Sequence, residues 1–130
     1  MEDFVSFELA NKLKEKGFNE GCYKYYEGKK LKWSNSPWLK PRYNDYLSHI
    51  TAAPTISQVL EWLRKKKKIS IEPGIHCSLK WMCSIYGFGD GIEDFTQYDN
   101  DGVWDTIYIL YDTYEQAVLA GIEYSLDNLI

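Results

Sequence analysis

Apolar side chains recur at helical spacing over residues 6–16, and this stripe predicts the first α-helix of the chain. Ser6 is suited to cap its N-terminus. Gly17 followed by Phe18 predicts a left-handed residue at its end, with a hydrophobic contact back onto the last turn. The stripe consists of Phe7, Ala10 and Leu13.

Two further stretches, residues 55–67 and 113–130, carry the same helical period. Each begins with the pattern of a capping box. In this motif the hydroxyl of the first residue accepts a hydrogen bond from the backbone N–H three residues later, and the amide side chain of that later residue accepts one from the backbone N–H of the first. The capping residues are Thr55 with Gln58, and Thr113 with Gln116. The apolar stripes are Ile56, Val59, Leu60 and Leu63 in the first, and Tyr114, Ala117, Val118, Ile122, Leu126 and Leu129 in the second.

Period-two alternation predicts the strands. Residues 22–33, "CYKYYEGKKLKW", alternate around Glu27-Gly28 and predict a β-hairpin. Residues 75–87 predict one long strand, and shorter strands are expected near 95–98 and over 104–111. The core face of the long strand is predicted to hold Cys77, Leu79, Trp81, Cys83 and Ile85.

Residues 34–54 contain three prolines and show no sustained period, so they predict an irregular loop. Loops of this length are uncommon in compact domains, and they are often functional or contain a short element. The element order α-β-β-α-β-β-(β)-α predicts an α+β fold: an antiparallel sheet of four to five strands with three helices gathered on one face. Residues 1–130 are expected to form a single domain without internal repeats.

Length and composition agree with a soluble domain. A chain of 130 residues with 45% hydrophobic residues is long enough to bury a core without metals or disulfides. Three cysteines without a C-x-x-C pair argue against a disulfide framework and a zinc site, and favour a reducing compartment. The first residues lack the basic charge of a secretory signal, and no apolar run approaches the roughly 20 residues of a membrane helix. We therefore expect a cytoplasmic protein without membrane contact.

The charge is distributed unevenly along the chain. All 15 Lys and Arg lie at or before Lys80, where nine acids leave a net +6, and the last 50 residues carry ten acids and no Lys or Arg. The two halves either face each other in the folded domain or form separate faces, and the sequence leaves both arrangements open. The basic run 64–68 complements the negative end of the second helix, although such runs also attract nucleic acid and membranes.

An acidic stretch, "DFTQYDNDGVWDT" at residues 94–106, has the residue types of a calcium loop. Aligning Gly102 with the glycine of an EF-hand leaves Gln97 and Tyr108 at two ligand positions, so the match fails. Asn100, Asp101 and Gly102 are typical of a hairpin turn, which we favour over a weak metal site or a carboxylate cluster of a two-metal enzyme. The carboxylates considered for such a cluster are Asp90, Glu93, Asp94, Asp99, Asp101 and Asp105.

Nucleophile chemistry finds little support in the sequence. His76 and Cys77 are adjacent on a predicted strand, so their side chains are expected on opposite faces. The glycines of residues 87–91 lack the following helix and the lysine of a phosphate loop. We therefore predict no catalytic constellation, no cofactor and no metal, and expect that the protein is not an enzyme.

The main functional candidate is the region 22–46, where basic and aromatic residues alternate. Such a mixture suits three roles: packing and edge protection of a hairpin, a protein interface, or stacking and phosphate contacts with single-stranded nucleic acid. A protein partner is preferred over nucleic acid as the functional role. The candidate binding surface comprises Tyr23, Lys24, Tyr25, Lys30, Lys32, Trp33, Trp38, Lys40, Arg42 and Tyr43.

Three segments carry a family resemblance: "LANKLKEKGFNEGCYKYY", "APTISQVLEWLRKKK" and "YDTYEQAVLAGIEYSLDNLI". Together they resemble a family of small uncharacterised proteins encoded by phages and mobile elements of gut anaerobic bacteria. The resemblance covers most of the chain but implies no activity, cofactor or catalytic residue, because its motifs are helix caps and packing stripes. It implies an accessory protein, and we expect a protein-interaction module, with nucleic-acid binding through residues 22–46 as the alternative.

Overall fold

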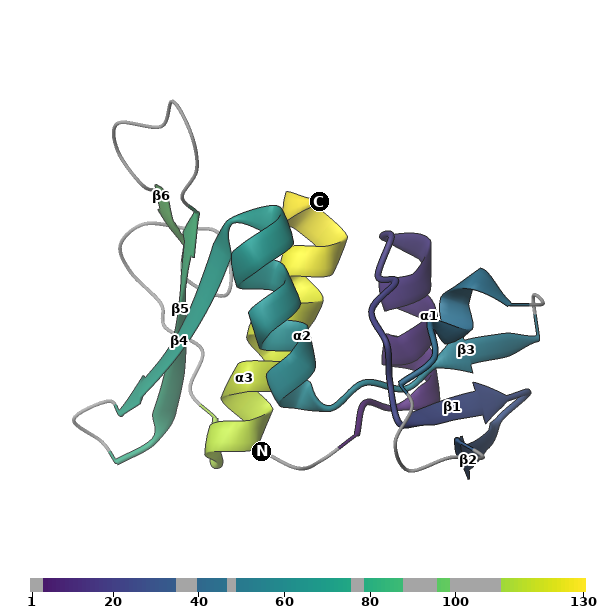
Figure 1. Ribbon diagram of the computed structural model, residues 1–130. Helices are drawn as coiled ribbons and strands as arrows, with labels where there is room; N and C mark the ends of the chain where they lie inside the picture. The colour runs from purple at the N-terminus through teal and green to yellow at the C-terminus, as the bar shows by residue number, and fades with distance from the viewer. Residues whose placement is uncertain (1–3, 35–39, 47–48, 76–78, 88–95, 99–110) are drawn as a thin grey trace. The chain divides into compact units, whose positions relative to one another are not determined.

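The computed structural model describes residues 4–34, 40–46, 49–75, 79–87, 96–98 and 111–130 (Figure 1). The chain divides into two compact units, Met1–Val59 and Leu60–Ile130, each with its own antiparallel sheet. No helix in the described ranges is long and apolar enough to reach across a membrane. The elements are α1 (Phe7–Glu15), β1 (Lys24–Glu27), β2 (Lys30–Trp33), η1 (Tyr43–Asp45), β3 (Ile50–Ala52), α2 (Ile56–Trp62), η2 (Leu63–Lys67), β4 (Ile69–Ile75), β5 (Trp81–Gly87), β6 (Thr96–Tyr98), α3 (Tyr114–Tyr124) and η3 (Ser125–Leu129).

Helix α1 begins and ends as its local sequence predicts. The Ser6 hydroxyl accepts a hydrogen bond from the Leu9 N–H at 3.2 Å, which satisfies one of the unpaired donors of the first turn. Gly17 has a φ of 93°, which a residue with a side chain rarely adopts, and it turns the chain back. The Phe18 N–H then donates to the Leu13 carbonyl at 2.9 Å, and the Phe18 ring is buried.

The first sheet has the strand order β2-β1-β3, with both pairs antiparallel. The hairpin predicted over residues 22–33 is confirmed: Glu27 pairs with Lys30 across a two-residue loop, and Gly28 in that loop has a φ of 60°. Strand β3 and the 3₁₀ turn η1 lie within residues 34–54, so the prediction of an irregular loop there was wrong in part. The other possibility, that residues 34–54 contain a short element, is confirmed.

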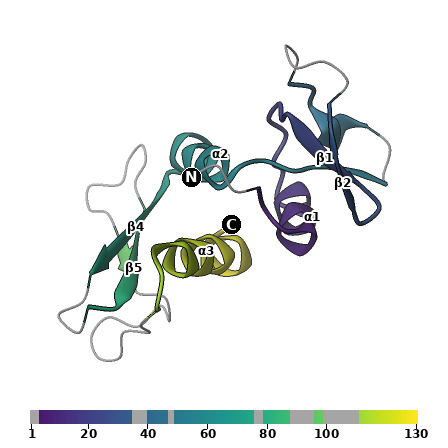
Figure 2. The same cartoon turned by 90° about the horizontal axis from the view of Figure 1, so that it is seen from below.

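The core of the first unit lies between α1 and this sheet (Figure 1 and Figure 2). Leu9, Ala10 and Leu13 are buried on the inner stripe of α1. Tyr26 of β1 is buried with them, and its hydroxyl donates to the Val5 carbonyl at 2.7 Å. A buried hydroxyl without a partner costs roughly 1–3 kcal/mol, so this bond fixes the segment that leads into α1.

Helix α2 carries the predicted capping box. The Gln58 N–H donates to the Thr55 hydroxyl at 3.2 Å, and the Thr55 N–H donates to the Gln58 side-chain oxygen at 3.0 Å. The helix continues into the π-helical turn η2, which ends at Lys68 in a left-handed conformation with a φ of 59°. The helical segment predicted over 55–67 is therefore confirmed, and the boundary between the two units falls inside it.

The second sheet has the order β4-β5-β6. One long strand over residues 75–87 was a wrong prediction, because Leu79 has a φ of 67° and is 83% exposed, and β5 begins only at Trp81. Strand β4 was missed because Pro73 and Gly74 normally argue against a strand. Among the described strands β4 lies at the edge of its sheet, where the missing N–H of proline is tolerated.

Helix α3 packs against β4 and β5 (Figure 2). The helix comes close to the sheet at Gly121. A Cβ atom at this position would lie 2.6 Å from the Cys83 Sγ and 2.8 Å from the Ile71 Cγ2. The capping box of Thr113 and Gln116 is formed as predicted. The inner stripe consists of the buried residues Ala117, Val118, Ile122 and Leu126.

The α+β class, the antiparallel pairing and the order of three helices in the described residues are confirmed. The described strands belong to two sheets of three rather than one sheet of four to five. Strand β6 matches the short strand expected near 95–98, whereas the strand expected over 104–111 lies outside the described residues except for Tyr111. A single domain over residues 1–130 stays a prediction.

Candidate functional site

The register of the β1–β2 hairpin distributes the candidate binding residues over two faces of the first sheet. Side chains directly opposite in an antiparallel pair share a face, and successive side chains alternate. The helix face, which contains Tyr26 and lies toward α1, holds Lys24, Tyr26, Leu31 and Trp33. The far face holds Tyr25, Glu27, Lys30 and Lys32.

On the helix face, the Lys24 ammonium lies between two aromatic rings. Its Nζ is 4.2 Å from the ring centroid of Phe4 and 4.1 Å from that of Trp33. The two rings meet edge to face, with centroids 6.1 Å apart. Cation–π contacts at exposed sites contribute about 0.5–1 kcal/mol, so Lys24 helps to hold the Trp33 indole, which is 65% exposed, in one orientation.

On the far face, Tyr25 stacks on Tyr43 from the turn η1, with centroids 4.4 Å apart. Tyr43 is only 5% exposed, and burial raises the pKa of its hydroxyl. It therefore supports Tyr25 from within the fold, and its place in the candidate binding surface is corrected to a packing role. Lys32 pairs with Glu27 on the same face, with its Nζ 3.3 Å from the Glu27 Oε2.

The remaining candidates lie before β1 and in the segment 40–46. Lys40 is placed with its Nζ 4.6 Å from the ring centroid of Tyr23. The Cys22 N–H donates to the Pro41 carbonyl at 3.1 Å, so this segment is held beside the start of the hairpin. Lys30 and Arg42 are exposed, and Trp38 lies outside the described residues.

The outer edge of β2 is the feature that sequence reasoning missed. In an antiparallel pair, hydrogen-bonded and non-hydrogen-bonded residue pairs alternate. The Ser34 N–H donates to the Tyr23 carbonyl at 2.7 Å, so Ser34 and Tyr23 form a hydrogen-bonded pair. Because the two kinds of pair alternate along the strand, Trp33 and Leu31 lie in non-hydrogen-bonded pairs. The N–H and C=O groups of these two residues therefore point away from β1, and among the described strands β2 has no neighbour other than β1.

The opposite edge of this sheet is covered. The Ala52 N–H of β3 donates to the Asn44 side-chain oxygen at 2.8 Å, and the Ile50 carbonyl accepts a hydrogen bond from the Lys14 ammonium at 2.9 Å. The Asn44 amide also donates to the Phe18 carbonyl at 2.6 Å, which ties this cover to the end of α1. The two edges of the sheet therefore differ: side chains cover β3, and among the described residues nothing covers the outer edge of β2.

Exposed apolar side chains accompany the open edge. Leu31 is 42% exposed and Trp33 is 65% exposed, and both lie on the helix face at the positions whose backbone groups point outward. The alternating sequence Lys30-Leu31-Lys32-Trp33 carried this signal, since it sets two apolar and two basic side chains on opposite faces. Leu31 was nevertheless not among the predicted site residues.

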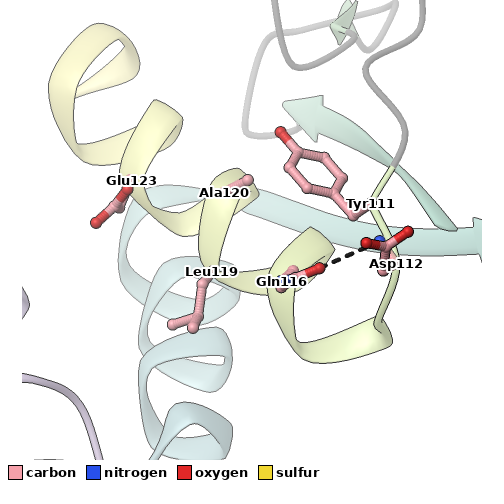
Figure 3. A pocket seen from close by; sticks show the side chains of 6 residues that line it. All are labelled: Tyr111, Asp112, Gln116, Leu119, Ala120 and Glu123. Atoms are coloured by element: carbon pink, nitrogen blue, oxygen red, sulfur yellow. Dashed lines mark hydrogen bonds between the residues drawn. The ribbon is translucent and has the colours of Figure 1, made fainter.

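An open groove of about 470 Å³ lies on α3 in the second unit (Figure 3). Two of its polar residues already serve the fold: the Gln116 side-chain oxygen accepts from the Asp112 N–H at 3.1 Å, and the Asp112 carboxylate pairs with Lys80 at 3.3 Å. The groove is lined by Tyr111, Asp112, Gln116, Leu119, Ala120 and Glu123.

Two of the three cysteines are described, and both are buried free thiols. Burial raises the pKa of Cys22 to about 12, partly opposed by the nearby Lys40, and raises the pKa of Cys83 to about 12. Because the thiolate is the nucleophile and the metal ligand, these two thiols are packing residues at neutral pH. His76 and Cys77 lie outside the described residues.

Within the described ranges, no three or more His, Cys, Asp and Glu side chains gather where they could hold a metal ion. The six carboxylates considered for a metal cluster, Asp90 and Glu93 with the four of the acidic stretch, lie outside these ranges, so the choice between hairpin turn and metal site there stays a prediction.

Comparisons with protein-family models, curated proteins and solved structures find no match to this chain. The resemblance to small phage and mobile-element proteins is therefore still an expectation from the sequence.

Proposed function

We propose that this chain is a small accessory protein that acts by binding another protein through the β1–β2 hairpin, without catalysing a reaction. The observation that carries the proposal is the exposure of Leu31 and Trp33 together on the outer strand of the first sheet. Large apolar side chains side by side on a surface are typical of interfaces, and tryptophan is among the commonest residues to dominate binding energy.

Preorganisation supports the same role. Trp33 is held by Lys24 and Phe4, so its indole loses less side-chain freedom on binding than an unrestrained ring. Lys24 lies on the same face as the apolar pair and supplies a charged group beside it, as the polar margins of protein interfaces commonly do. The resemblance to small phage and mobile-element proteins implies an accessory protein, which agrees with such a role.

Nucleic-acid binding through residues 22–46 is the rival function. A single-strand binder needs aromatic faces and basic side chains along one surface. In this hairpin the most exposed ring, Trp33, shares its face with Lys24 alone, and Lys30 and Lys32 lie on the far face. The ring on that far face, Tyr25, is already stacked on the buried Tyr43. This separation favours the protein partner.

The test is affinity purification of the tagged chain from its native cells, with and without nuclease. The double variant Leu31→Ser with Trp33→Ser is compared with the control Ile75→Ser, which removes a side chain that is 62% exposed in the second unit. We expect a defined protein that survives nuclease, is retained by the control and is lost from the double variant.

Two results would contradict the proposal. The first is equal capture by the double variant and the control, which would place any contact elsewhere. The second is a partner set that disappears with nuclease; quenching of Trp33 fluorescence by single-stranded DNA that weakens steeply with salt would then identify nucleic-acid binding.

A further inference from the structure

We propose that the partner binds by adding an extended, acidic strand to the outer edge of β2. This inference rests on the proposed function and specifies its binding mode and the chemistry of the partner. Strand addition uses main-chain hydrogen bonds for affinity and alternate side chains for specificity, so both must be available at the edge.

The main-chain groups are available. The hairpin register directs the N–H and C=O of Leu31 and Trp33 outward, and within the described part of the chain β2 pairs with β1 alone. An exposed strand edge is a template for another strand unless it is blocked. The edge of β3 is blocked by Asn44 and Lys14, whereas that of β2 carries no such cover among the described residues.

The side chains of β2 define what an added strand must carry. Its helix-face positions would meet the exposed Leu31 and Trp33, and its far-face positions would meet Lys30 and Lys32. A segment that alternates apolar and acidic residues matches both faces, because directly opposite charges of unlike sign stabilise a strand pair. Residues 24–33 carry four lysines and one glutamate, so the hairpin has a net positive charge. This charge also attracts an acidic partner at longer range, before the two molecules touch.

The same charges disfavour a second copy of this chain. If β2 paired antiparallel with β2 of another copy, aligning Leu31 with Leu31 would set Lys30 against Lys32. Aligning Leu31 with Trp33 would set Lys32 against Lys32. Lysines directly opposite each other destabilise a strand pair, so β2 pairs less favourably with a second β2 than with an acidic strand.

The first experiment uses a defined probe, a ten-residue peptide alternating valine and glutamate, added to the full chain. The controls are the same residues in two blocks and a peptide alternating valine and lysine. We expect only the acidic alternating peptide to bind. Amide exchange should slow at Leu31 and Trp33, whose N–H groups point outward, and should change little at Lys32, whose N–H already faces β1.

The second experiment separates backbone pairing from side-chain contact. Leu31→Ala and Leu31→Pro both remove the leucine, but only proline also removes the outward N–H, at an edge position where proline is tolerated. We expect the proline variant to bind the acidic peptide at least tenfold more weakly than the alanine variant. Circular dichroism checks that both variants are folded, and the exchange experiment on the unaltered chain stands if the proline variant unfolds.

Several outcomes would overturn strand addition: failure of the acidic peptide to bind, equal binding of the lysine peptide, or no added protection at Leu31 and Trp33. A concentration-dependent dimer in sedimentation that Leu31→Pro abolishes would assign the edge to a second copy instead. If strand addition fails while partner capture still depends on Leu31 and Trp33, the binding mode is wrong and the proposed function stands.

Discussion

Lys24 and Trp33 face each other across the β1–β2 pair, with the Lys24 Nζ 4.1 Å from the centroid of the Trp33 ring. The contact joins the inner strand of the hairpin to its outer strand on the face that carries the exposed apolar side chains. It therefore links the stability of the first sheet to the presentation of the candidate binding residue.

A double-mutant cycle should detect this link. With Lys24→Met and Trp33→Ala, we expect a coupling free energy of about 0.5–1 kcal/mol in urea unfolding, the size of an exposed cation–π contact. The control pair is Lys30→Met with Trp33→Ala, because Lys30 lies on the far face. Additive effects of Lys24→Met and Trp33→Ala would show that the observed distance carries no stabilisation.

The buried thiols should make the protein sensitive to alkali. Each has a folded-state pKa of about 12 against an ordinary value of 9.0, so between these pH values the unfolded chain releases the proton and the folded chain keeps it. The free energy of unfolding is therefore not reduced by the thiols below pH 9. As the pH rises from 9 toward 12, it falls by up to about 1.4 kcal/mol per pH unit for each thiol. Urea midpoints measured over this range should decline less steeply in Cys83→Ala than in the unaltered chain, and an equal slope in the two would exclude this origin.

Gly121 should not tolerate a larger residue. In Gly121→Ala the added methyl would crowd the Cys83 Sγ and the Ile71 side chain, so we expect a loss of roughly 1–3 kcal/mol despite the better helix propensity of alanine. Gly74→Ala is the matched control, because a Cβ there meets nothing within 4 Å. Thermal unfolding of the two variants compares them directly, and an unchanged midpoint in Gly121→Ala would mean that α3 can move away from the sheet.

Lys68 occupies a backbone conformation that suits glycine better. With a φ of 59° it costs about 1–2 kcal/mol relative to an unstrained residue, so Lys68→Gly should stabilise the protein by several tenths of a kcal/mol after the loss of a favourable charge at the helix end. Lys66→Gly, inside the π-helical turn, should destabilise it by about 1 kcal/mol. Opposite signs in denaturant unfolding confirm the prediction, and loss of stability in both variants contradicts it.

The elements that the sequence predicted well are those whose signals are local. Ser6 and Gly17 bound α1, and Gly28 marks the turn of the first hairpin, because caps and tight turns depend on residues within a few positions. Strand β3 was missed because its three residues gain their pairing from β1, which lies more than 20 positions earlier. In the second unit, Leu79 fits the alternating pattern of a strand but adopts a positive φ. The alternation therefore predicted a continuous strand where the backbone of Leu79 is not extended.

The candidate surface was predicted by composition and only partly by geometry. Trp33 and Lys24 are on one face and Lys32 is on the other, and only the pairing register reveals this division. Tyr43 looked like an accessible ring because aromatic content carries no information on burial. Leu31 was overlooked because a single leucine between lysines is unremarkable until the strand that bears it is known to be the outermost.

The unequal edges of the first sheet also determine how many molecules can assemble on it. Since Asn44 and Lys14 occupy backbone groups of β3, a strand added at β2 has no counterpart at the other side of the sheet. A sheet that can add strands at both edges can propagate into a fibre, whereas a sheet with one open edge can bind only one added strand. Any complex formed at β2 should therefore stop at a fixed one-to-one stoichiometry, whatever the concentration of the partner.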